Sequence, residues 1–427
     1  MISEQEAVDT IPLRNWFLAG FIASFYPLLG FKRTFSIIGI VLAIWGLILI
    51  FRRGRQLLDN PAVSTALLVA ACFWLPLLTA LPDAEYPAHS AVETLKALLS
   101  LPILISMITL VQDHRITRPF LWMSIATVAF WVLDALTQQI LGQDLFGRNY
   151  SAEVGRIGAY WLNQAKFGYY MGFYGLFALA ALMTVMPARR ILHVFAWLFV
   201  TAAVLISGNR EAWLMFFPFS ILLFWVHIAK PSRHPWLLLL GAVLILSVLG
   251  FTAWELSETV QNRVTQSLQG FSLDYDAINK ASSQRLGLWS AAVELFMVNW
   301  FNGMGLEGFQ LAFPGYTDDP YWRTAGAEMY THQYILEILT STGLIGLAGL
   351  IAIMIIIGRT WHHALPTART LAWPALIYLA ALWFPLNTHR SFYSSELMMG
   401  NWIMLGMLLG NLLPAATDSL RPASEPT

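Results

Sequence analysis

The sequence predicts an all-α polytopic membrane protein, and three features of its 427 residues lead to this fold class. First, 57% of the residues are hydrophobic and only 12% are charged, which is more apolar surface than a soluble fold of this length could bury. Second, apolar residues form continuous runs of about 20, the length of an α-helix that crosses a bilayer. Third, 18 tryptophans suit the aromatic belts at membrane–water interfaces.

About twelve apolar runs, separated by charged residues or by proline and glycine, are the predicted transmembrane helices. They lie near residues 16–30, 35–51, 62–81, 92–111, 119–141, 166–186, 190–207, 211–229, 234–254, 333–358, 369–387 and 396–413. This threading divides the chain into four parts: transmembrane helices in 1–254, a large loop in 255–332, further transmembrane helices in 333–413 and a short tail in 414–427.

The short loops place most basic residues on one side of the membrane. Lys and Arg gather on that side at 52–55, 115–118, 189–190, 230–233 and 359–369, while Lys32 and Arg33 are an exception on the other side. Because cytoplasmic loops carry the excess of Lys and Arg, both termini are predicted to be cytoplasmic and the large loop to lie outside. The acidic start lacks the basic segment of a cleavable signal peptide, so the first run is expected to remain as a span.

Charge and cysteine content exclude several classes of function. The formal net charge is zero, with 25 basic and 25 acidic side chains, so no nucleic acid partner is expected. The single cysteine, Cys72, can form no internal disulfide and no cysteine-based metal site. No phosphate-binding or dinucleotide-binding glycine motif is visible, so no cofactor is expected.

The large loop has a pattern of its own. Its apolar residues Leu286, Trp289, Val293, Phe296 and Trp300 recur at spacings of three and four, which predicts an amphipathic helix lying on or in the outer leaflet. Glycines at 303, 305 and 308 then end the helical pattern. A loop of this length is longer than a connection requires, so we expect the chemistry of the protein there.

Two arginines are candidates for binding an anion at the outer face. Arg210 directly precedes the eighth span, where an arginine can equally anchor a helix to lipid phosphates. Arg285 is predicted in the first turn of the loop helix, with Ser282 or Ser283 as N-cap, although it could be an ordinary solvated charge. Together the two guanidinium groups could clamp a diphosphate through bidentate hydrogen bonds.

His332 stands where the large loop re-enters the membrane as the tenth span. A position in the first turn of that helix favours the neutral imidazole, which is the form that acts as a general base. The alternative is an interfacial histidine with no role in chemistry. Gln333 beside it, and His389 and Arg390 between the last two spans, are further candidates at the same face.

Acidic residues give a weaker case for a metal. Asp274 and Asp276 form an Asp-x-Asp motif, and Asp318 and Asp319 form a second acidic pair. No His or Cys ligand set stands beside them, so no metal site is expected. Asp134 falls inside the fifth span, where a carboxylate should be paired, protonated or lining a cavity.

Three segments resemble motifs of the O-antigen ligase and polymerase superfamily, whose members build bacterial surface polysaccharides. Ser207–Leu214 is similar to its Ser-x-Ser-Arg segment, and Arg285–Phe309 to its arginine, tryptophan and Gly-x-Gly-x-x-x-Phe run. Thr331–Leu347 is similar to its His-Asn-x-x-Leu and Glu-x-Gly run. The order of the segments, the number of spans and the large loop before the histidine agree with that family.

The resemblance implies a metal-independent, inverting glycosyltransferase of GT-C-like architecture in the bacterial inner membrane. Its donor would be an O-antigen glycan on undecaprenyl diphosphate, its acceptor a sugar hydroxyl of lipid A-core, and its active site would face the periplasm. Arg210 and Arg285 would hold the diphosphate, and His332 would remove the proton of the acceptor hydroxyl.

Departures from the family motifs leave the subfamily open. Gln333 stands where an Asn is usual, Trp300 and Phe301 replace the usual proline turn, and Glu211 replaces a small residue. An O-antigen polymerase or a protein O-oligosaccharyltransferase would share the arginines and the base. A transporter or flippase of lipid-linked glycans is the alternative from a different class, although the polar candidates gather at one face and not at the midplane.

Overall fold

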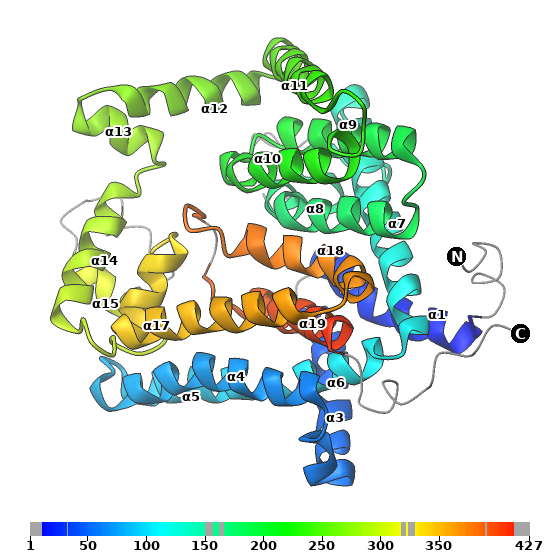
Figure 1. Ribbon diagram of the computed structural model, residues 1–427. Coiled ribbons are helices and arrows are strands. Elements are labelled where there is room, and N and C mark those ends of the chain that lie inside the picture. Colours follow the sequence, from blue (N-terminus) through cyan, green and yellow to red (C-terminus); the bar gives the residue numbers. More distant parts are fainter. Residues whose placement is uncertain are drawn as a thin grey trace, which may run out of the picture. The chain divides into compact units, whose positions relative to one another are not determined.

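The computed structural model is built from α-helices (Figure 1) and describes residues 11–31, 33–149, 157–161, 166–316, 322, 329–388 and 391–413. Eight helices in this part of the chain are long and apolar enough to cross a membrane: Ser36–Leu57, Pro61–Asp83, Pro87–Val111, Arg115–Leu141, Phe167–Val185, Arg210–Ala229, Pro235–Leu256 and Tyr334–His363. The protein is therefore an all-α, multi-pass membrane protein, which confirms the predicted fold class.

The other four predicted spans are helical but shorter or more polar. The first corresponds to α1 (Leu13–Ala23) and α2 (Phe25–Leu28), the seventh to α9 (Arg190–Ile206), and the last two to α18 (Pro366–Leu382) and α19 (Ser395–Leu412). The total of twelve spans stays a prediction.

The chain folds into two compact units, each assembled from distant parts of the sequence. Unit 1 comprises Met1–Ile38, Asp113–Ser267 and Trp373–Phe384. Unit 2 comprises Gly39–Gln112, Leu268–Ala372 and Pro385–Thr427.

Unit 1 is organised around α8 (Phe167–Val185), which is buried along nearly its whole length. The helices α7 (His114–Leu141), α9 and α10 (Arg210–Phe224) pack against α8. Aromatic rings fill the centre of this unit, where Tyr26 stacks on Tyr174 with ring centroids 3.7 Å apart. A π-helical turn (Trp225–Ala229) extends α10, and α11 (Pro235–Leu256) and α12 (Glu258–Leu268) follow.

Unit 2 is organised around α19, whose residues from Leu397 to Leu412 are nearly all buried. The helix α6 (Leu101–Val111) packs along α19, and the long helix α17 (Tyr334–His363) packs along α4 (Pro61–Ala80). Because α19 is enclosed by protein, it can carry Asn401 and Asn411 in its interior. The described part of this unit also contains α3 (Ser36–Arg53), α5 (Pro87–Leu98), α13 (Tyr275–Ala281), α14 (Leu286–Val298) and α15 (Gly308–Ala312).

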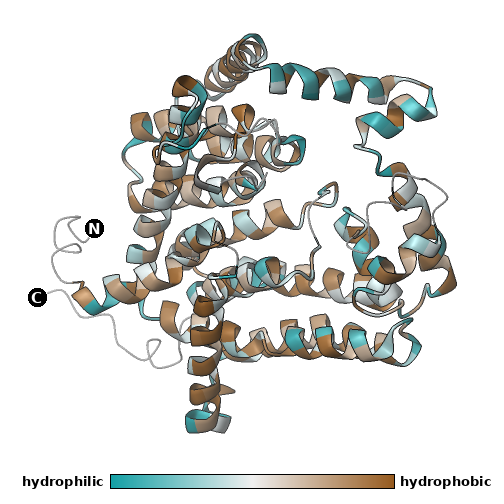
Figure 2. Ribbon diagram, turned by 180° about the vertical axis from the view of Figure 1, so that it is seen from behind, coloured by the Kyte–Doolittle hydropathy of each residue, from teal (hydrophilic) through white to brown (hydrophobic). Residues whose placement is uncertain are grey.

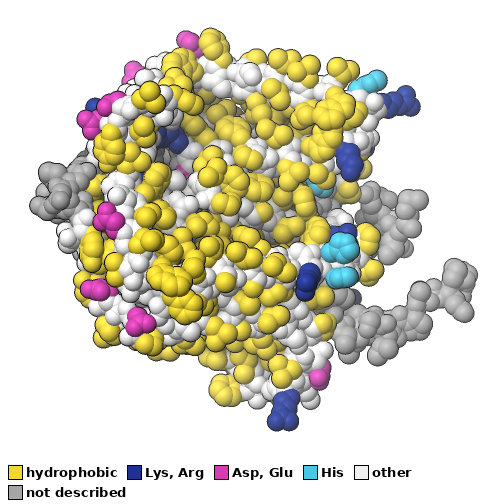
Figure 3. Space-filling view, turned by 60° about the vertical axis from the view of Figure 1, so that its left-hand side comes forward, with side chains coloured by type: hydrophobic (Ala, Val, Ile, Leu, Met, Phe, Trp, Pro, Cys, Tyr) yellow, Lys and Arg dark blue, Asp and Glu magenta, His cyan; other side chains and the backbone are white. Residues whose placement is uncertain are grey.

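Hydrophobic side chains cover much of the face seen in Figure 3. On α11, which is coloured mainly as hydrophobic in Figure 2, Trp236, Val248 and Phe251 are 71%, 63% and 66% exposed. Contiguous apolar surface of this kind is expected to face lipid. In contrast, α12 and α13 carry mostly hydrophilic residues.

The helix α17 is broken at Gly343, within its candidate membrane span. Gly343 has φ 61° and ψ −158°, a conformation that essentially only glycine adopts. Such a break takes backbone N–H and C=O groups out of the helical hydrogen-bond pattern, and in a membrane these groups need other partners within the protein.

Residues 300–305, between α14 and α15, supply these partners. Four backbone hydrogen bonds join them to α17: Met304 N–H to Thr340 O (2.8 Å), Gly305 N–H to Ser341 O (3.0 Å), Leu344 N–H to Trp300 O (2.9 Å) and Ile345 N–H to Phe301 O (3.1 Å). Gly303 has φ 75°, and a Cβ there would lie 2.3 Å from the Thr342 nitrogen. Glycine therefore allows this segment to lie directly against the broken helix.

The same segment also contacts the α4–α5 end of unit 2. The Ser90 hydroxyl donates to the Leu306 carbonyl at 2.9 Å, and the Asn302 amide donates to the Thr79 carbonyl at 3.0 Å. Residues 300–306 thus join α4 and α5 to α17 around its break at Gly343.

Candidate functional site

In unit 1, a tight turn between α9 and α10 positions Arg210. Gly208 has φ 62°, and the Asn209 side chain caps α10 by accepting hydrogen bonds from the N–H groups of Glu211 (3.1 Å) and Ala212 (3.2 Å). Arg210 is therefore the first residue of α10, whereas the sequence predicted it directly before the span. An arginine at a helix N-terminus adds its charge to the positive end of the helix dipole.

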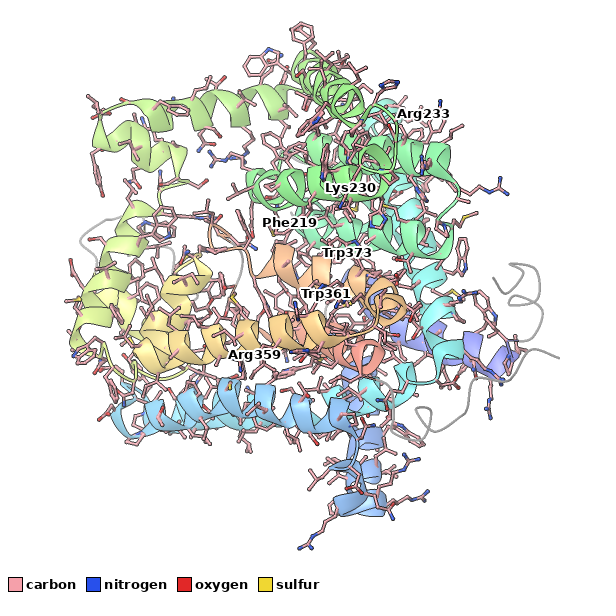
Figure 4. The ribbon with its side chains drawn as sticks, viewed as in Figure 1. Phe219, Lys230, Arg233, Arg359, Trp361 and Trp373 are labelled. Carbon is pink, nitrogen blue, oxygen red and sulfur yellow. The ribbon has the colours of Figure 1, made fainter. Side chains whose placement is uncertain are left out.

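The side chain of Arg210 reaches α12. Its Nη1 donates to the Ser267 hydroxyl at 3.2 Å, and that hydroxyl donates to the Arg263 carbonyl at 2.7 Å. Arg210 is half-buried by these contacts. The opposite end of this helical segment leads to Lys230 and Arg233, which lie before α11 (Figure 4).

In unit 2, the polypeptide before α14 positions Arg285. Ser283 and Gln284 both have φ 61°, the left-handed region that such residues seldom adopt. Arg285 is the N-cap residue of α14 and not part of its first turn, while the Ser282 hydroxyl accepts from the Arg285 N–H at 3.2 Å. The prediction was therefore one residue out, because these two left-handed residues delay the helix start. Arg285 Nη1 donates to the Thr388 carbonyl at 3.2 Å.

One turn along α14, Trp289 holds the segment that contains His332. The indole Nε1–H of Trp289 donates to the Thr331 carbonyl at 3.1 Å. His332 is half-buried, and its ring lies edge-on to Tyr330 with centroids 5.1 Å apart. The prediction that His332 lies in the first turn of the tenth span is wrong: α17 begins at Tyr334, and His332 precedes the N-cap with φ 47°.

Gln333 is the residue that caps α17. Its Oε1 accepts from the Leu336 N–H at 2.6 Å, and its Nε2 donates to the Pro385 carbonyl at 2.8 Å. A glutamine can therefore do here what a shorter capping side chain does at other helices. The two contacts also tie the His332 segment to residues 385–388, the segment that Arg285 contacts.

A buried carboxylate, Glu337, was not among the sequence candidates. It accepts hydrogen bonds from the Ser391 hydroxyl (2.5 Å) and the Phe392 N–H (2.7 Å). A cavity of about 20 Å³, large enough for one water molecule, lies among Glu337, Thr331 and Tyr393. Burial raises the pKa of the Tyr393 phenol, so that this group stays neutral. A carboxylate inside a predicted span was the signal that could have identified Glu337.

The loop helix forms as predicted, but a different face of it is buried. Leu288, Ala291, Ala292 and Leu295 pack into a cluster with residues that include Met304, Phe309, Phe313 and Trp322. Of the predicted stripe, Val293 is 47% and Trp300 is 52% exposed. The stripe was expected to face the outer leaflet, so its exposure does not contradict the prediction, whereas the cluster that covers the other face of α14 was not predicted.

The acidic candidates have structural contacts. Asp274 is exposed and caps α13 by accepting from the Ala277 N–H at 3.0 Å, and Asp276 lies exposed in that helix. Asp134 is fully buried, and its Oδ1 accepts from the Leu145 N–H at 2.7 Å. Four predicted residues lie outside the described part of the chain: Asp318, Asp319, His389 and Arg390.

One group in unit 2 has the chemistry of metal ligands. Ligand atoms of His89, Glu93 and Glu307 lie within 4.8 Å of one another. Both carboxylates are already paired, Glu307 with His89 and Glu93 with the Lys96 ammonium at 2.5 Å. A bound cation would have to compete with these ion pairs.

Unit 2 thus brings together most of the predicted residues. One set of hydrogen bonds joins the start of α14, the segment around His332 and residues 385–388. Arg285 bonds to Thr388, Trp289 to Thr331, and Gln333 to Pro385. Arg210 belongs to unit 1, where it forms its own set with α12. These features define a multi-pass membrane protein with polar, arginine-bearing sites at helix N-termini.

Comparison with protein families identifies the segment that contains these residues. Residues 194–351 match the model of the O-antigen ligase family, so the chain carries an O-antigen ligase domain there and the predicted resemblance is confirmed. The match runs from α9 to α17 and includes Arg210, Arg285 and His332. A comparison with curated proteins gives no match. Family and fold together indicate a membrane enzyme of the ligase or polymerase type that acts on lipid-linked glycans.

Proposed function

We propose that this protein is an O-antigen ligase of the bacterial inner membrane. It transfers the glycan of undecaprenyl-diphosphate-linked O-antigen to a sugar hydroxyl of lipid A-core, completing lipopolysaccharide. The observation that carries this proposal is that one family match, described as an O-antigen ligase, includes both arginines and the histidine.

In the proposed reaction, the acceptor hydroxyl attacks the anomeric carbon of the donor sugar from the face opposite the diphosphate. The C–O bond to the diphosphate breaks, and undecaprenyl diphosphate leaves with the bonding electrons. Arg210 and Arg285 stabilise the negative charge that develops on the leaving group. His332 takes the proton of the attacking hydroxyl. Because the donor already has a good leaving group, neither a metal nor a cofactor is needed.

The surroundings of His332 support its role as the base. The residue before His332, Thr331, accepts a hydrogen bond from Trp289. The residue after it, Gln333, bonds to Leu336 of α17 and to Pro385. The imidazole is therefore attached to a backbone that is fixed on both sides, as a catalytic group requires.

The position of the basic residues supports a periplasmic site. Arg210 begins the 20-residue span that ends at Ala229, whereas Lys230 and Arg233 follow its other end. Since the basic end is expected in the cytoplasm, Arg210 and the large loop 255–332 would lie at the periplasmic surface, and both termini in the cytoplasm.

The deciding experiment is transfer in vitro with purified protein, undecaprenyl-diphosphate-linked O-antigen and lipid A-core, in the presence of EDTA. We expect capped lipid A-core as the product. The His332→Ala protein should lose transfer by at least about 100-fold yet still bind the donor, because general-base catalysis contributes that much. Exposed His363 lies at the other end of α17, so His363→Ala is a matched control. Full activity of His332→Ala would exclude the base role.

The arginines are tested through donor binding. Arg210→Ala and Arg285→Ala should each weaken binding of undecaprenyl diphosphate, whereas the exposed Arg233→Ala should not. Equal binding by all three variants would exclude the clamp.

A deletion strain separates the ligase from its relatives. Loss of capped lipopolysaccharide with accumulation of lipid-linked polymer supports the ligase, whereas capping with one repeat indicates a polymerase. Unchanged lipopolysaccharide with an unglycosylated protein target indicates a protein O-oligosaccharyltransferase. If purified protein gives no product but moves the donor lipid across vesicles, the protein is a flippase.

A further inference from the structure

The helix α12, which contacts the turn that holds Arg210, contains a third arginine, Arg263. Val260 and Val264 of α12 pack into a hydrophobic cluster with residues of α9, α10 and α11 that include Leu205, Trp213 and Ala253. Arg263 lies between these two valines in the sequence and is half-buried. The inner face of α12 therefore includes a cation in addition to its apolar residues.

Contacts at both ends of α12 fix this face against the α9–α10 turn. Near its start, the Thr259 methyl group lies 2.5 Å from where a Cβ on Gly208 would be. Near its end, the Ser267 hydroxyl accepts from Arg210 and donates to the carbonyl of Arg263. Ser267 is four residues after Arg263, so their side chains are neighbours on one face of the helix. The Ser267 hydroxyl thus contacts the Arg210 guanidinium and the backbone carbonyl of Arg263, and the helical spacing places the Arg263 side chain on the face of α12 that Arg210 reaches.

No carboxylate in the described part of the chain pairs with Arg263. Among the described residues it forms no ion pair, and its one side-chain hydrogen bond goes from Nη1 to Gln266 Oε1 at 3.0 Å. Burial lowers the pKa of Arg263, because the charged form is partly removed from water. A half-buried cation is costly without a counter-ion, and a bound anion would remove that cost.

We propose that Arg263 binds the diphosphate of the lipid donor together with Arg210, so that unit 1 presents a pair of arginines to the leaving group. This inference rests on the proposed function and deepens it. A diphosphate has two phosphate groups, and two guanidinium groups from adjacent helices can each bond to phosphate oxygens. Arg263 was absent from the sequence candidates because it lies in a polar stretch with no motif around it.

The test measures binding of undecaprenyl diphosphate to purified full-length protein in detergent, followed by tryptophan fluorescence, together with the kinetics of transfer. Arg263→Gln removes the charge but keeps a polar side chain that can bond to Gln266. We expect its Kd for undecaprenyl diphosphate to rise about 10- to 100-fold, the range for a lost hydrogen bond between charged groups. The KM for the donor should rise similarly, while the KM for lipid A-core stays unchanged.

Two further variants separate charge from structure. Asn262→Ala changes an exposed neighbour on the same helix and should bind as the wild type does. Arg263→Lys keeps the charge and should bind more tightly than Arg263→Gln. If Arg263→Gln does not fold, the Kd of Arg263→Lys is compared with that of Asn262→Ala: a higher Kd for Arg263→Lys supports a guanidinium contact with phosphate, and an equal Kd overturns it.

The outcomes distinguish this proposal from the proposed function. If the wild type neither binds undecaprenyl diphosphate nor transfers glycan, the proposed function fails. If the wild type does both and Arg263→Gln binds as Asn262→Ala does, the ligase stands and the role of Arg263 is wrong. Equal Kd values for Arg263→Lys and Arg263→Gln would likewise overturn a role of its charge.

Discussion

The break in α17 predicts that replacing Gly343 by alanine destabilises the protein. In a Gly343→Ala protein, the new Cβ would lie 2.3 Å from the Phe301 carbonyl oxygen, so the segment 300–305 would have to move away. The unfavourable backbone conformation costs about 1–3 kcal/mol. If two of the four backbone hydrogen bonds are also lost, at about 0.5–1.5 kcal/mol each, the destabilisation is about 2–6 kcal/mol.

The matched control is Gly358→Ala in the same helix. Nothing lies within 4 Å of a Cβ at Gly358, so alanine there should be neutral or stabilise the helix by up to about 1 kcal/mol. In Gly303→Ala, the new Cβ would approach the backbone of α17 from the segment 300–305. This variant should therefore be destabilised to a similar extent as Gly343→Ala.

The assay is thermal unfolding in one detergent at a fixed scan rate, because unfolding of such a protein is expected to be irreversible. Scaled from smaller domains to 427 residues, the midpoint of Gly343→Ala should fall by roughly 2–10 °C. Hydrogen exchange should also accelerate at the Leu344 and Ile345 amides, which donate to the segment in the native protein. If the midpoint of Gly343→Ala equals that of Gly358→Ala, the contact between residues 300–305 and the broken helix α17 does not stabilise the protein.

Two other predictions concern the start of α17. Gln333→Ala removes the cap of α17 and the hydrogen bond to Pro385, so it should lower the unfolding midpoint by the equivalent of about 1–2 kcal/mol. The control Gln333→Asn should keep the cap. Identical midpoints for the two variants would exclude the capping role. In Glu337 each carboxylate oxygen accepts one hydrogen bond, and Glu337→Gln replaces one of these acceptors by an NH2 group. The variant should therefore cost about 1–3 kcal/mol and reduce transfer by displacing residues 391–393. Wild-type activity and stability would show that this carboxylate does not hold the segment.

The positions of the helices follow well from the sequence. The run 166–186 corresponds to α8 at Phe167–Val185, and the run 234–254 to α11 at Pro235–Leu256. Apolar length decides these elements, and it is a local property of the chain. The break at Gly343 is different, because a glycine within an apolar run looks ordinary until the segment 300–305 is known to lie against it.

The candidate site was predicted in part. Arg210 was predicted directly before the eighth span and is the first residue of α10, so the apolar run that follows it predicts its position to within one residue. His332 was placed inside a helix because the side chain of Gln333, which caps that helix, is not among the usual capping residues. Glu337 should have been found by the rule that singled out Asp134, whereas Arg263 depends on how α12 packs and has no signal in the sequence.

The break in α17 also divides the helix by length. The part from Leu344 to His363 has about 20 residues and is about 30 Å long, which is enough to cross the hydrocarbon of a bilayer unaided. The preceding part, Tyr334 to Thr342, adds about 13 Å that the hydrocarbon does not need. This part can therefore lie in the headgroup layer, which, under the proposed function, would place His332 above the lipid tails and at the level of the lipid-bound phosphate.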